Sequence, residues 1–108
     1  MAVVVWLVIA LASAVGQTPV PQIEAGRRLY VAEKCSVCHL VAGQGNKRYP
    51  LDGVGRRLTA VELRRWFTHT VEMEDRLSKQ PAIRMSSRKY KLSDPELDAL
   101  VAYLQSLK

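Results

Sequence analysis

The sequence predicts an all-α domain, and three observations carry this prediction. Two segments begin with the capping pattern of a helix N-terminus and continue with apolar residues at three- and four-residue steps. A third segment, directly before the two cysteines of the chain, shows similar helical spacing. No alternation of apolar and polar residues is long enough to indicate a strand of useful length. We therefore expect a small helical domain.

The N-terminal segment Met1–Gly16 carries no charged side chain. Its apolar run at 2–12 has the length of the hydrophobic part of a secretory signal and is well short of the roughly twenty residues that span a bilayer. Small residues follow at 12–14 (ASA) and 14–16 (AVG), which fit a signal-peptidase site. We therefore predict that residues 1–16 are a signal peptide and that the protein is periplasmic or otherwise extracytoplasmic. Because no Lys or Arg precedes the apolar run, an uncleaved anchor and a misplaced start codon are the alternatives.

The next elements follow in order along the chain. Residues 17–23 are predicted to be an extended spacer, because Pro19 and Pro21 each disfavour helix in the preceding residue. The folded domain then covers residues 24–108 and opens with a helix over 24–34. Between Ala42 and Gly55, four glycines and a proline predict a loop without regular structure.

Capping pairs mark the starts of two further helices. Thr59 and Glu62 form the first pair, and Ser93 and Glu96 form the second. The apolar side of the first helix is expected to contain Leu63, Trp66, Phe67 and Thr70 or Val71. The apolar residues of the second helix recur to the chain end at Leu97, Leu100, Val101, Leu104 and Leu107.

Size and charge limit what the chain can be. All 16 Lys and Arg and all 10 Asp and Glu lie from Glu24 onward, so the net charge of +6 belongs to the predicted domain. In a chain this short an apolar core alone is marginal, and such domains often depend on disulfides, metals or another bound group. Two cysteines cannot make a disulfide framework. The composition disfavours a multidomain enzyme, a disordered tail and a polytopic membrane protein.

The pentapeptide at 35–39 (CSVCH) carries the chemistry. Cys35 and Cys38 lie about one helical turn apart, so they can bond to the two vinyl groups of one haem, with His39 as the proximal iron ligand. A redox dithiol would need a βαβ surround, a zinc site would need a fourth ligand besides His69, and a structural disulfide would have no need of His39. Export, the lack of other cysteines and the small core favour one covalently bound haem c.

Three segments resemble class I c-type cytochromes, the small monohaem cytochrome c family. They are 25–46, which contains the CSVCH motif, 49–67 and 90–108. The resemblance implies a small cytochrome c-like helical domain wrapped around one haem, in which the first and last helices cross closely. It also implies that Gly26 is small so that Tyr103 can pack there.

The resemblance also implies the sixth iron ligand. Family members present a methionine from the loop that corresponds to 80–91, where this chain has Met85. The family often has proline after this methionine, and this chain has Ser86. Met73, His69 and an open sixth position are the alternatives.

Further contacts to the haem are expected from the same resemblance and from the needs of its charged groups. The carbonyl of Pro50 is the implied acceptor for the second ring nitrogen of His39. Arg56, Arg57 and the indole N–H of Trp66 are candidate donors to the haem propionates. For the two arginines, a solvated face is the alternative.

Basic residues without any acidic one occupy the segment that would frame the haem edge. They are Arg76, Lys79, Arg84, Arg88, Lys89 and Lys91. Such a collar can steer acidic electron-donor and electron-acceptor proteins, although a solvated basic loop would have the same charge. Export and the lack of a recognition motif disfavour nucleic acid. We expect membrane contact only through an uncleaved N-terminal segment, anionic headgroups or a membrane-bound redox complex.

The predicted function is electron transfer, with no enzyme activity of its own. A soluble periplasmic carrier with His/Met-ligated iron would shuttle single electrons between redox partners. The alternative is a fixed haem subunit of a larger respiratory or oxidoreductase complex. An open-site haem enzyme or sensor is the third candidate, and for peroxide chemistry the chain supplies no distal acid and base beyond His69.

Overall fold

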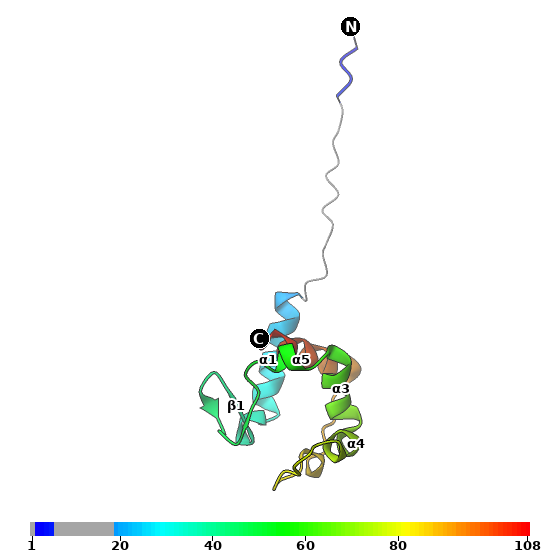
Figure 1. Cartoon of the computed structure of the whole chain (residues 1–108). Coiled ribbons are helices and arrows are strands. Elements are labelled where there is room, and N and C mark those ends of the chain that lie inside the picture. The colour runs from blue at the N-terminus through cyan, green and yellow to red at the C-terminus, as the bar shows by residue number, and fades with distance from the viewer. Residues whose placement is uncertain (1, 6–18) are drawn as a thin grey trace.

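The structure, a computed structural model, describes residues 2–5 and 19–108 and is mainly helical, which confirms the predicted class. The helices are α1 (Val20–Ala32), α2 (Val54–Arg57), α3 (Ala60–Thr68), α4 (Thr70–Asp75) and α5 (Asp94–Ser106). Two short 3₁₀ turns, η1 (Cys35–Val37) and η2 (Met85–Ser87), carry a cysteine and a methionine of the predicted site. Figure 1 shows α1 and α5 side by side, with the β1 segment to one side and α3 and α4 to the other.

Most of the predicted signal peptide lies outside the described residues, as does the start of the spacer. Residues 2–5 are described, are not helical and expose the three valines Val3, Val4 and Val5. Within residues 2–5 and 19–108, no helix is long and apolar enough to cross a membrane.

Helix α1 begins four residues earlier than the sequence predicted. It starts at Val20, so residues 20–23 belong to the helix and not to an extended spacer. Pro19 is the N-cap and Pro21 lies in the first turn. Backbone N–H groups of the first turn have no acceptor within the helix, so the N–H that proline lacks costs no hydrogen bond there. The two prolines therefore mark the start of the helix rather than a linker before it.

Helices α1 and α5 cross at Gly26, as the resemblance to class I c-type cytochromes implied. A Cβ at this position would overlap the carbonyl oxygen of Ala99 and would lie 2.7 Å from the Cβ of Tyr103. The Tyr30 and Tyr103 rings then pack with their centroids 5.5 Å apart. Glycine is required here because the backbones of two helices come into direct contact.

Helix α5 supplies most of the buried core. Its start is fixed by the predicted capping box between Ser93 and Glu96, which the structure confirms. Its buried residues are Leu97, Ala99, Leu100, Val101, Ala102, Tyr103 and Leu104. Helix α3 is tied to it through Arg64, which pairs with Asp94 at 3.0 Å and also with Asp98.

The helix predicted after Thr59 is shorter than expected. The capping box of Thr59 and Glu62 is confirmed, and Leu63 is buried. The helix breaks at His69, and the separate helix α4 follows, in which Val71 is exposed rather than on the buried side. Thr70 begins α4, with its hydroxyl bonded to the carbonyl oxygen of Trp66 at 2.8 Å.

The predicted loop at 42–55 contains more regular structure than the sequence indicated. The strands β2 (Gln44–Gly45) and β3 (Tyr49–Pro50) flank β1 (His39–Val41) in a sheet of order β2-β1-β3. β1 pairs antiparallel with β2 and parallel with β3, in a register that sets His39 opposite Tyr49. Strands of two or three residues are too short to show an alternating pattern in the sequence. Gly45, at a φ of 111°, allows the chain to turn tightly next to β1.

Candidate functional site

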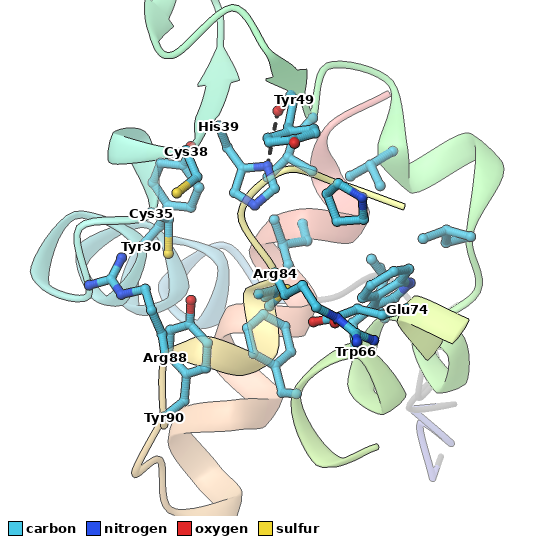
Figure 2. Close-up of a pocket in the computed structure, with 18 of the residues that line it drawn as sticks. Tyr30, Cys35, Cys38, His39, Tyr49, Trp66, Glu74, Arg84, Arg88 and Tyr90 are labelled. Carbon is cyan, nitrogen blue, oxygen red and sulfur yellow. Dashed lines mark hydrogen bonds and ion pairs between the residues drawn. The ribbon is translucent and has the colours of Figure 1, made fainter. Parts of the chain in front are cut away.

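A cavity of about 370 Å³ is lined by residues from all five helices and from the segments between them. Its walls are mainly apolar and come from the five helices, η1, the β1 and β3 segments and the segment that carries η2. The predicted site residues on its walls are Cys35, Cys38, His39, Pro50, Arg57, Trp66 and Met85. Figure 2 shows the close-up of this cavity.

The two cysteines follow the end of α1. Lys34, in the left-handed region at φ 57°, ends the helix and turns the chain into η1, so that both cysteines reach the cavity wall. Both are free thiols, and Cys35 is buried. Burial raises the pKa of the Cys35 thiol to about 11, and the nearby Arg88 guanidinium offsets only part of this. Cys35 is therefore a neutral thiol at pH 7, unlike the low-pKa thiolate of a redox-active dithiol.

The ring of His39 is fixed by a backbone acceptor. Its Nδ1 lies 2.9 Å from the carbonyl oxygen of Tyr49. Because a carbonyl can only accept, Nδ1 carries the hydrogen and Nε2 has a free lone pair. Figure 2 shows that this second nitrogen points into the cavity. Burial lowers the pKa of His39 against the opposing effect of the Tyr49 bond, so the imidazole is neutral and able to bind a metal.

The acceptor predicted for His39, the carbonyl of Pro50, is wrong by one residue. The parallel pairing of β1 with β3 sets His39 opposite Tyr49 and Leu40 opposite Pro50. Pro50 lines the cavity, but the carbonyl that meets the imidazole belongs to Tyr49. The register of two short strands decides this contact.

The three candidates for the sixth ligand occupy different environments. Met85 is half-buried and lines the cavity. Met73 is buried in α4 and does not line it. His69 is exposed between α3 and α4, where its Nδ1 shares a hydrogen bond of 2.9 Å with the hydroxyl of Thr68. Of these three described residues, Met85 alone lies on the same cavity as His39.

One comparison with known proteins gives a match. A model of the family described as cytochrome c matches residues 23–108. The chain belongs to the cytochrome c family. Its cofactor is therefore covalently attached haem c, and members of the family serve in haem-based electron transfer. Comparisons with curated proteins and with solved structures found no match.

The residues of this cytochrome c domain fit a haem. Two thiols, an imidazole with a free Nε2 and a thioether share one largely apolar cavity. The hydroxyl of Tyr30 is buried beside them and has no hydrogen-bond partner among the described residues. Burial raises the pKa of Tyr30 to about 12, so the phenol keeps its proton as a donor for a bound group. No group of three or more His, Cys, Asp and Glu suited to a metal ion occurs within the described part of the chain.

The residues predicted to bind haem propionates are only partly brought together. Trp66 and Arg57 line the cavity, and Nη1 of Arg57 donates to the carbonyl oxygen of Asp52 at 3.0 Å. Arg56 is exposed and is not among the residues that line the cavity, so its role as a donor to a propionate stays a prediction.

Sequence reasoning missed Glu74 and placed Arg88 only in the basic collar. Glu74 lines the cavity with 1% of its surface exposed, although its surroundings in α4 resemble a solvated helix face. Arg88 lines it too, and its guanidinium donates to the carbonyl oxygens of Glu33 at 3.0 Å and Lys34 at 3.3 Å. No sequence signal marks either residue, because both contacts depend on how the segment after α4 folds back.

Proposed function

We propose that this cytochrome c domain carries single electrons between extracytoplasmic redox partners, with haem bonded to Cys35 and Cys38 and iron held by His39 and Met85. The supporting observation is that these four side chains line one cavity and that His39 has its Nε2 free. When bound, the haem supplies a one-electron Fe(III)/Fe(II) couple.

Each residue has a separate task in this proposal. The thiols of Cys35 and Cys38 would add to the two vinyl groups, become thioethers and hold the group in place. Tyr49 keeps His39 in the tautomer that offers Nε2. Met85 offers a soft thioether, which suits Fe(II) and raises the reduction potential. A filled sixth position also keeps small ligands from the iron, which favours electron transfer over catalysis.

The proposed partners are acidic proteins that dock by charge. Within the predicted basic collar, two arginines are neutralised locally, since Arg84 pairs with Glu74 and Asp75 and Arg76 pairs with Glu72. Four basic residues remain exposed, and the ion pairs found in the described residues do not involve them: Lys79, Arg88, Lys89 and Lys91. These residues would provide the long-range attraction that speeds short-lived docking.

The proposal is tested by replacing the two methionines separately. Met85→Ala should turn the spectrum high-spin, lower the reduction potential and let carbon monoxide bind the reduced protein readily, because the thioether ligand is lost. Met73→Ala should cost about 2–5 kcal/mol of stability through the cavity it leaves and should change none of these spectra.

The measurements are absorption spectra of both oxidation states and a redox titration of each purified holoprotein. An unchanged spectrum in Met85→Ala would refute the proposed ligand. If His69→Ala instead became high-spin, the iron would be ligated by two histidines. Rapid carbon monoxide binding by the wild-type protein would point to an enzyme or sensor with an open site.

A further inference from the structure

The carboxylate of Glu74 is buried beneath the segment that carries Met85. Glu74 lies in α4 with 1% of its surface exposed, as buried as the core leucine Leu100. Among the described residues, Glu74 is the one charged residue whose side chain is buried in the core. A buried carboxylate is costly unless hydrogen bonds replace its lost water, so its partners show what the burial achieves.

Those partners are the two residues that flank Met85. Oε2 of Glu74 accepts hydrogen bonds from Nε of Arg84 at 2.5 Å and from the hydroxyl of Ser86 at 3.0 Å. Oε1 accepts the backbone N–H of Ser86 at 2.5 Å. Arg84 is held further by Asp75, at 2.9 Å from its Nη2. One carboxylate thus fixes the chain immediately before and immediately after Met85.

These bonds keep Glu74 ionised. Desolvation raises the pKa of the Glu74 carboxyl, but the hydrogen bonds from Arg84 and Ser86 outweigh this and hold the pKa below its usual range. Hydrogen bonds to a charged acceptor are about twice as strong as neutral ones. Figure 2 shows Glu74 and Arg84 together in the cavity region.

The segment around Met85 has little regular structure of its own. Its one element is the 3₁₀ turn η2, three residues long and without a side-chain cap. Ser86 supplies two donors to Glu74, and a proline at this position would lack the backbone N–H. The contact with Glu74 is therefore the main restraint that joins η2 to α4.

We infer that Glu74 is a positioning residue that holds the Met85 segment against the cavity and so controls how readily the sixth iron position opens. The inference rests on the proposed function, in which Met85 is an iron ligand. An external ligand binds only the fraction of molecules in which Met85 has left the iron, so its apparent affinity measures that fraction.

The test is imidazole binding to the ferric holoprotein, followed by absorption. Glu74→Gln keeps the size of the side chain and removes its charge, so the closed arrangement should weaken and the apparent affinity for imidazole should rise at least about tenfold. The reduction potential should fall as the methionine-bound fraction decreases. Glu72→Gln is the matched control, because Glu72 is on the same helix but pairs with Arg65 and Arg76 on the surface. It should bind imidazole as the wild type does.

A second variant covers the case in which Glu74→Gln does not fold. Ser86→Ala removes one hydrogen bond to the carboxylate and keeps the backbone one, so it should give a smaller rise in imidazole affinity. Unchanged imidazole affinity in Ser86→Ala would overturn the inference. So would a Glu74→Gln protein that folds with lowered global stability but binds imidazole as the wild type does, because the ion pair would then be merely structural. An unchanged spectrum in Met85→Ala would instead remove the proposed ligand, and the inference with it, so the two failures are distinguished.

Discussion

At the scale of single residues, hydrogen bonds to backbone carbonyl oxygens orient two side chains of the site, His39 and Arg88. The Tyr49 carbonyl selects the tautomer of His39, and two main-chain carbonyls at the end of α1 receive the guanidinium of Arg88. A cation at the C-terminus of a helix also complements the helix dipole. Hydrogen bonds to neutral carbonyls leave the charge of Arg88 in place, so this side chain serves the fold and also adds to the positive charge of the collar.

The cysteines give a direct prediction at this scale. In the purified holoprotein, the haem should resist acid-acetone extraction and remain with the chain in denaturing electrophoresis, because thioether bonds survive both treatments. Replacing Cys35 and Cys38 together by alanine should give a chain without haem and without a folded structure by circular dichroism. Haem that is extracted from the wild-type protein would contradict covalent attachment.

Residue types and short spacings were enough to predict the two thiols and the imidazole that line the cavity. Cys35, Cys38 and His39 lie within five consecutive residues, so their relation needs no knowledge of the fold. Met85 followed from family resemblance, since nothing local separates it from Met73. The carbonyl that meets His39 was predicted one residue too late, at Pro50, because strand register is settled by the whole structure.

At the scale of elements, the two helix starts marked by capping boxes were predicted, whereas the start of α1 at Val20 and the end of α3 at Thr68 were not. A capping box is a local hydrogen-bond pattern, and both predicted boxes are present. The break at His69 has no comparable signature, because no glycine or proline stands there. The burial of Glu74 escaped prediction for a related reason, since the residues that cover it come from beyond the helix.

The crossing of α1 and α5 gives a prediction at this scale. Gly26→Ala should destabilise the holoprotein by about 1–3 kcal/mol in denaturant unfolding, because the added methyl group meets the backbone of Ala99 and no flexible side chain can yield. Arg28→Ala, at an exposed position of the same helix, should stay within about 0.5 kcal/mol. A stabilised Gly26→Ala protein, as expected for an open helix position, would show that the helices do not touch there.

At the scale of the whole molecule, the cavity is large for so short a chain. The cavity of about 370 Å³ lies against the core residues Tyr30, Leu63 and Leu100, so without a bound group these apolar side chains lack packing partners. A small domain has only about 5–15 kcal/mol of net stability. The cofactor is therefore expected to be part of the core rather than an addition to it.

Apoprotein should consequently be largely disordered at 25 °C. Circular dichroism of the haem-free chain should show little of the helix content of the holoprotein, and hydrogen exchange should show little protection in α5. A cooperatively folded apoprotein would contradict the view that the haem completes the core.

The pairing of α1 with α5 also sets the order in which the chain can mature. The partner that covers Gly26 and Tyr30 is the last helix of the chain, so a polypeptide that emerges from its N-terminus presents Cys35, Cys38 and His39 long before that helix is available. During this interval the thiols are not yet buried, so haem can reach a segment that has not closed into the cavity. Packing of α5 on α1 then completes the core around Tyr30. The topology thereby allows the cofactor to be loaded before the core is complete.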